Sequence, residues 1–143
     1  MIKIILDTNF LIYCAKEKLD YTEEIEKIIN ESYELVVPSS VIEELKKVIF
    51  KKKPDFISKL KKRNLKYKKT TGKDKEAASL ALELLEYNKV NAITTSGKTV
   101  DDSIINLAKE NKKNIVCTLD REMRHILGRV ILINKGKKLI LTK

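Results

Sequence analysis

Four acidic residues stand at positions from which their carboxylates could bind divalent cations together: Asp7, Glu44, Asp101 and Asp120. Each lies directly after a predicted buried strand or in the first turn of the helix that follows one. Carboxylates that share a site raise one another's pKa unless a cation neutralises them. Because the set offers oxygen ligands and contains neither His nor Cys, it predicts Mg²⁺ or Mn²⁺, bound as one ion or two.

Two of these acids come at the ends of apolar runs. Asp7 follows Ile2–Leu6, in which four of the five residues are apolar, and Asp120 follows Ile115–Leu119. Short apolar runs are typical of strands buried in a parallel sheet. Ligands of open α/β sheets bind outside the carboxyl ends of such strands. Either acid alone could simply cap the next helix, and only the recurrence of the pattern favours a shared site.

The acid at position 44 has an acidic neighbour, so the two must be distinguished. Ser40 and Glu43 have the spacing of a capping box at the start of a helix predicted over Val41–Phe50. That arrangement gives Glu43 a structural role. It leaves Glu44 as the candidate for the site, although the doubled acid keeps both residues open.

The acid at position 101 also has an acidic neighbour. Thr99 is predicted to cap a helix, which puts Asp102 where a reciprocal cap would lie. Asp101 then shares a helix face with Ile104 and Ala108. An acid at the head of an inward apolar face is costly unless it is paired or bound to metal. We therefore prefer Asp101 to Asp102 as the ligand.

Predicted strands and helices alternate along the chain. Further strands are predicted over Leu35–Pro38, Ala92–Thr95 and Val130–Ile133, with an edge strand over Lys138–Thr142. Further helices are predicted over Tyr21–Asn30, Pro54–Arg63, Lys73–Tyr87, Val100–Glu110 and Arg121–Leu127. This alternation predicts an α/β fold with a mostly parallel sheet. The length, without repeats or a low-complexity linker, predicts a single domain over residues 1–143.

The positive charge of the chain is concentrated in one segment. Residues 46–69 contain twelve Lys and Arg against the single acid Asp55, a net charge of +11, while the remaining 18 basic and 19 acidic residues give −1. A basic patch on an otherwise neutral domain indicates a polyanion partner, and we favour nucleic acid over a merely solvated face. The candidate contacts are Lys51, Lys52, Lys53, Lys61, Lys62 and Arg63.

Composition excludes several other classes of protein. No apolar stretch approaches the length of a membrane span, and the start of the chain has no secretory signal pattern. We therefore expect a cytoplasmic protein with no membrane partner. Cys14 and Cys117 lie inside apolar segments, which predicts buried thiols and no disulfide framework or zinc site.

The acidic motifs, in their order and spacing, resemble those of the PIN-domain ribonucleases. Four stretches carry the resemblance: Ile5–Asn9, Val41–Leu45, Asp101–Ile105 and Cys117–Arg121. The acid of the second family motif directly precedes a Leu, as Glu44 does, and Thr118 and Asp120 match the fourth motif. The resemblance spans residues 2 to 133, and within it Asp101-Asp102 and the run Thr118–Ile126 are especially similar to the PIN nucleases of ribosomal RNA processing. The size also fits VapC-type toxins, and the basic segment lies outside the motif set.

This resemblance implies a three-layer α/β/α PIN-like fold around a mostly parallel sheet of about five strands. It also implies a metal-dependent endoribonuclease, in which the four acids hold ions that activate water and stabilise the attacked phosphate. Asn9 and Thr118 would orient those ligands. Ribosomal RNA processing is the main expectation. The alternatives are a VapC-type toxin ribonuclease and a PIN module that binds RNA without cutting it. Candidate partners besides RNA are a second copy of the chain, an antitoxin or a ribosome-assembly protein.

Overall fold

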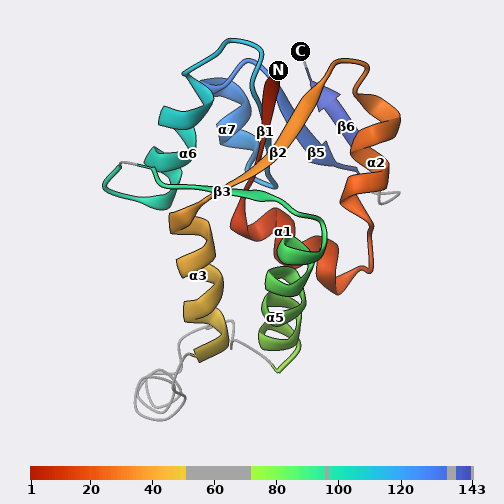
Figure 1. Ribbon diagram of the computed structural model, residues 1–143, viewed down its shortest axis with the longest axis vertical. Helices are drawn as coiled ribbons and strands as arrows, with labels where there is room; N and C mark the ends of the chain where they lie inside the picture. Colours follow the sequence, from red (N-terminus) through yellow and green to blue (C-terminus); the bar gives the residue numbers. More distant parts are fainter. Residues whose placement is uncertain (51–71, 96, 135–137, 143) are drawn as a thin grey trace.

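The computed structural model of the protein describes residues 1–50, 72–95, 97–134 and 138–142 (Figure 1). Its strands are β1 (Ile2–Leu6), β2 (Tyr33–Pro38), β3 (Asn91–Ile93), β4 (Ile115–Cys117), β5 (Val130–Ile133) and β6 (Leu139–Thr142). Its helices are α1 (Thr8–Lys16), α2 (Tyr21–Ile28), α3 (Ser39–Phe50), α5 (Gly72–Tyr87), α6 (Val100–Ala108) and α7 (Arg121–Ile126). The helix predicted over Pro54–Arg63 falls outside the described residues.

The strands form one sheet in the order β3-β2-β1-β4-β5-β6. The pairs from β3 to β5 are parallel, and β6 pairs antiparallel with β5. The predicted α/β fold with a mostly parallel sheet and a C-terminal edge strand is therefore confirmed. Because β2 and β3 lie on one side of β1 while β4 and β5 lie on the other, the strand order reverses between β1 and β4. In open α/β sheets this reversal is where ligands bind, outside the carboxyl ends of the strands.

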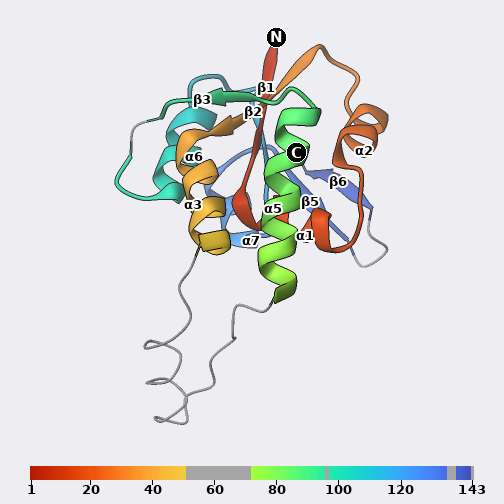
Figure 2. The same cartoon turned by 60° about the horizontal axis from the view of Figure 1, so that its bottom comes forward.

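Helices cover both faces of the sheet. From β1 to β3 the chain adds strands toward one edge of the sheet, and from β3 to β5 it adds them toward the other edge. Because the crossovers are right-handed in both directions, α6 and α7 lie on the face opposite the earlier helices. Helix α6 packs against β1 and β4, α7 packs against β5, and α1 and α3 both pack against α5. Figures 1 and 2 show α3 and α5 side by side, projecting beyond the end of the sheet where β1 leads into α1.

The strands that flank the reversal are buried on both faces, as their apolar composition predicts. Ile4, Ile5 and Leu6 of β1 are 0% exposed, and every residue of β4 is buried. Cys14 and Cys117 lie in the same core as free thiols, which confirms the predicted absence of a disulfide. In the described part of the chain, no helix has the length and apolar composition needed to cross a lipid bilayer.

Helix α3 begins earlier than the sequence predicts. It starts at Ser39, directly after Pro38 ends β2, so Ser40 lies inside the first turn and does not precede the helix. The Ser40 hydroxyl is buried and has no hydrogen-bond partner among the described residues. The predicted capping box of Ser40 and Glu43 is therefore wrong. A serine followed by an acid three positions later fits a cap only if the preceding backbone is non-helical, and here the helix has already begun at Ser39.

Candidate active site

Asp7 is the most buried of the four candidate acids, at 6% exposure. It leaves the end of β1 beside β4, where its backbone N–H donates to the Cys117 carbonyl over 3.1 Å. Its side chain accepts two hydrogen bonds, one at Oδ1 from the Thr8 N–H (2.8 Å) and one at Oδ2 from the Thr118 hydroxyl (2.9 Å). Both carboxylate oxygens are therefore held in fixed positions at the reversal of strand order.

The surroundings of Asp7 favour its neutral form. Burial raises the pKa of this carboxyl from 3.8 to about 6, although the hydrogen bonds from Thr118 and Thr8 act in the opposite direction. The negative charges of Asp101 and Glu44 raise the pKa further. Repulsion of this kind requires the carboxylates to be near one another. The structure therefore brings Glu44 and Asp101 toward Asp7, from α3 and α6 respectively.

Thr118 joins Asp7 to the fourth acid. The Thr118 side chain is fully buried after β4, and its Oγ1 accepts a hydrogen bond of 3.0 Å from the Asp120 N–H while donating to Asp7. Asp120 Oδ1 accepts from the Glu122 N–H over 2.9 Å, which makes Asp120 the N-cap of α7. A single threonine thus fixes the loop that carries Asp120 relative to the Asp7 carboxylate.

Each of the two pairs of neighbouring acids contains one residue that differs from the other in exposure or in its effect on the pKa of Asp7. On α3, Glu44 is half-buried and Glu43 is exposed. On α6, Thr99 is the N-cap, as predicted, and its hydroxyl accepts from the backbone N–H of Asp102 over 3.1 Å. The helix face that Asp101 shares with Ile104 and Ala108 is buried, as predicted, but Asp101 itself is exposed, as is Asp102. Of these four acids, Glu44 and Asp101 are the ones whose charges act on Asp7.

Gly97 lets the loop before α6 lie close against the helix that carries Asp101. A Cβ at Gly97 would lie 2.8 Å from the Ser103 nitrogen and 3.0 Å from the Ser103 hydroxyl oxygen. Its φ of +156° is also a conformation that side chains rarely adopt. The position of the α6 N-terminus therefore depends on a residue without a side chain.

The donor set suits a hard divalent cation, but the side chains are not gathered around one point. Among the described residues, no three Asp, Glu, His or Cys side chains are close enough to hold an ion as they stand. Buried hydroxyls without a partner in the described residues follow three neighbouring strands at this edge, at Thr8, Ser40 and Thr95. Because unpaired buried hydroxyls cost free energy, this edge favours polar ligands or water.

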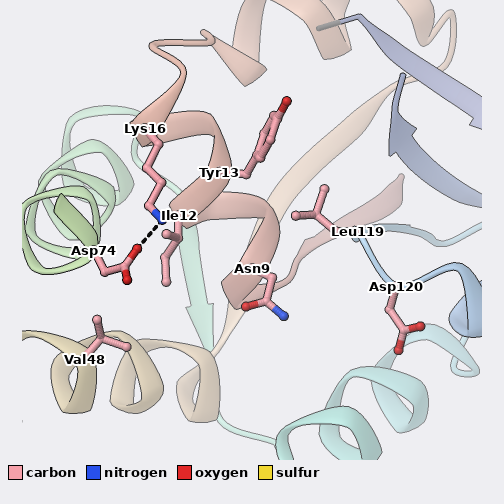
Figure 3. Close-up of a pocket in the computed structure, with 8 residues that line it drawn as sticks. All are labelled: Asn9, Ile12, Tyr13, Lys16, Val48, Asp74, Leu119 and Asp120. Carbon is pink, nitrogen blue, oxygen red and sulfur yellow. Dashed lines mark ion pairs between the residues drawn. The ribbon is translucent and has the colours of Figure 1, made fainter. Parts of the chain in front are cut away.

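A cavity of about 620 Å³ extends from Asp120 along α1. One face of α1 lines it with Asn9, Ile12, Tyr13 and Lys16, which have helical spacing that the sequence analysis did not use. In Figure 3, Asn9 lies between Asp120 and the ion pair that Lys16 makes with Asp74 of α5. Asn9 is exposed and lines this cavity.

Six predicted nucleic-acid contacts lie outside the described residues: Lys51, Lys52, Lys53, Lys61, Lys62 and Arg63. The described part of the chain contains other cations close to the site. Arg121 directly follows Asp120, and Arg124 lies one helical turn further along α7. The sequence analysis did not identify either arginine as a candidate contact, because the excess positive charge of the chain lies in residues 46–69.

Residues 4–134, most of the chain, match the family model of the PIN like domain. The chain belongs to this PIN-like family. It is 38% identical over 127 residues to Ribonuclease VapC4 of Methanocaldococcus jannaschii, an alignment that covers 89% of this chain and 83% of that protein. The PIN-like fold is similar to that of the PIN domain endonuclease Utp24, with a TM-score of 0.63 over 96% of this chain and 90% of the other. That pair is 16% identical, so it shows the fold alone. The resemblance drawn from the four acidic motifs is confirmed.

Proposed function

We propose that this protein is a metal-dependent endoribonuclease of the VapC type. The chain is a PIN-domain ribonuclease by family and by its 38% identical relative, Ribonuclease VapC4. The observation that carries the metal dependence is the buried Asp7 carboxylate, whose pKa is raised to about 6 with the charges of Asp101 and Glu44 contributing. The negative charges of Asp101 and Glu44 repel an ionised Asp7, which does not stabilise the fold. A divalent cation bound between these carboxylates would relieve that repulsion.

In the proposed reaction, Asp7, Glu44, Asp101 and Asp120 hold Mg²⁺ or Mn²⁺, in a site for one ion or two. Divalent ions held by these carboxylates would lower the pKa of a bound water and would offset charge on the phosphate. Thr118 and the Thr8 N–H keep the Asp7 oxygens in place, so that ordering them costs less when the ion binds. Asn9 is proposed to contact the substrate or a bound water from the wall of the cavity beside Asp120.

The biological role we favour is that of a toxin ribonuclease paired with an antitoxin, acting in the cytoplasm. A relative named VapC4 supports this alternative more strongly than the main expectation of ribosomal RNA processing. The latter has only the fold likeness to Utp24 at 16% identity. The basic residues 46–69 would hold the RNA backbone next to an acidic site that otherwise repels it.

The test is cleavage of single-stranded and structured RNA with Mg²⁺, with Mn²⁺ and with EDTA. We expect cleavage at internal positions of the RNA. EDTA should abolish this cleavage, and added metal should restore it. Glu44→Gln should lose activity, whereas the matched variant Glu43→Gln, which removes the exposed neighbouring acid, should keep it. Full activity in excess EDTA would contradict the metal dependence. RNA that is bound but never cut with either ion would indicate a binding module.

A further inference from the structure

A second cavity, of about 370 Å³, shares Leu119 with the first one as a lining residue. Arg121 and Arg124 of α7 line it together with Asn134, which directly follows β5. Leu119 and Ile140 contribute exposed apolar surface to it. Because β5 runs parallel to β4, its carboxyl end lies at the same edge of the sheet as Asp120. The cavity therefore continues the proposed active site by one strand.

Among the described residues, the charged side chains that line this cavity are Arg121 and Arg124, and neither of them makes an ion pair with another described residue. The cation of the first cavity, Lys16, is in contrast paired with Asp74. Arg121 and Arg124 are three residues apart on a helix, so their side chains project from the same face. Two exposed guanidinium groups without an acidic partner are suited to binding a phosphodiester, which they can contact through paired N–H donors.

We propose that Arg121 and Arg124 form a subsite for an RNA phosphate next to the one that is cut. This inference rests on the proposed ribonuclease function, and it assigns a path for the RNA strand across the site. The strand passes Asp120, with one neighbouring phosphate held by the α7 arginines and the other side of the strand entering the cavity along α1.

The first experiment measures RNA affinity without cleavage. Arg121→Gln, Arg124→Gln and the double variant are made in full-length Asp7→Asn protein, and binding of a labelled oligouridylate is followed at several salt concentrations. Each substitution should weaken binding about fivefold and flatten the plot of log affinity against log salt by roughly 0.7. Lys112→Gln is the matched control, because it removes an exposed charge in the turn before β4, at the opposite edge of the sheet. It should change neither quantity.

A second experiment locates the phosphate. A single uncharged methylphosphonate linkage is moved along the oligonucleotide, and affinity is measured for each position. Protein with both arginines should lose affinity at a linkage adjacent to the cleavage site. The double variant should show no further loss at that linkage while remaining sensitive at the others. Equal sensitivity of both proteins at every linkage would overturn the subsite.

Activity distinguishes this inference from the function on which it depends. In otherwise unaltered protein, the double variant should raise KM more than it lowers kcat, with an unchanged melting temperature. Arg124→Lys should recover part of the affinity, since it keeps the charge and loses the paired donors. If the unaltered protein never cuts RNA, the proposed function fails, while the binding measurements still decide whether Arg121 and Arg124 bind an RNA phosphate. If it cuts RNA and the double variant keeps its affinity and salt slope, or loses only an acidic protein partner, the subsite is wrong.

Discussion

The hydroxyl of Thr118 donates to Asp7 Oδ2 over 2.9 Å, although the two residues are 111 positions apart in the sequence. The contact exists because β1 and β4 are neighbours in the sheet, with Leu6 opposite Cys117, so the residues that follow the two strands emerge together. The same hydroxyl accepts the N–H of Asp120. One side chain therefore couples the geometry of two acids to the pairing of the two central strands.

Asp7→Asn should abolish cleavage without loss of stability at neutral pH. The native state favours protonated Asp7, since its pKa is raised from 3.8 to about 6. The free energy of unfolding should therefore fall as pH rises from about 4 to about 6, by roughly 3 kcal/mol. Asn carries no charge and should not show this fall. Urea denaturation of both proteins at several pH values, without divalent ions, measures the difference. Parallel pH profiles would show that Asp7 does not titrate as described.

Thr118→Val should damage the site more than its small change in volume suggests. It removes the donor to Asp7 Oδ2 and the acceptor for the Asp120 N–H, two partners within a buried region. Leaving them unpaired should cost about 1–3 kcal/mol and lower activity. Thr118→Ser keeps the hydroxyl and should retain most of both. Thermal unfolding and turnover of the two variants make the comparison, and equal behaviour of Val and Ser would exclude the hydroxyl's role.

The two acids at the start of α6 should be unequal. Asp101→Asn should lose activity, because the Asp101 charge acts on Asp7. Asp102→Asn should leave activity and stability nearly unchanged, because the Thr99 hydroxyl caps its backbone N–H and that bond survives the substitution. Thr99→Ala, which removes the cap itself, should cost about 1 kcal/mol. Turnover measured for both Asn variants decides the assignment, and the reverse ranking would make Asp102 the ligand.

Replacing Lys51, Lys52 and Lys53 with Glu should weaken RNA binding for every sequence tested. The prediction rests on charge alone, since residues 46–69 carry +11 and the rest of the chain −1. Phosphate contacts position nucleic acid without specifying its sequence, and each lost contact should flatten the salt dependence by roughly 0.7. RNA titrations at several salt concentrations measure this. An unchanged slope, together with loss of a protein partner, would assign the segment to that partner.

Much of the fold follows from local sequence patterns. The apolar runs before Asp7 and Asp120 predict strands whose burial the structure confirms, and Thr99 caps its helix as expected. The pairing of β1 with β4 cannot be inferred from either run, because it depends on crossovers elsewhere in the chain. The hydrogen bonds of Thr118 depend on that pairing, so the sequence alone does not predict them either.

Errors in the sequence analysis arose where a local motif had two possible placements. Ser40 fits a cap only if α3 starts after it, and the helix starts at Ser39. The face of α6 that includes Asp101 was predicted to be inward, but a residue in the first turn can share a helix face with buried residues and still lie in solvent. Arg121 and Arg124 lie in the run that carries the fourth motif, but only the cavity that both line identifies them as a pair.

The two thiols of the core have a practical consequence for chemical labelling. Cys14 and Cys117 are the only cysteines in the sequence, and they are 1% and 0% exposed. Burial raises the pKa of Cys14 to about 12 and that of Cys117 well above its usual value. Because the thiolate is the reactive form, maleimides should not modify the folded protein at neutral pH. A single cysteine introduced on the surface, for example at Lys112, would then be the sole point of attachment for a fluorophore or a cross-linker, with no native cysteine to remove first.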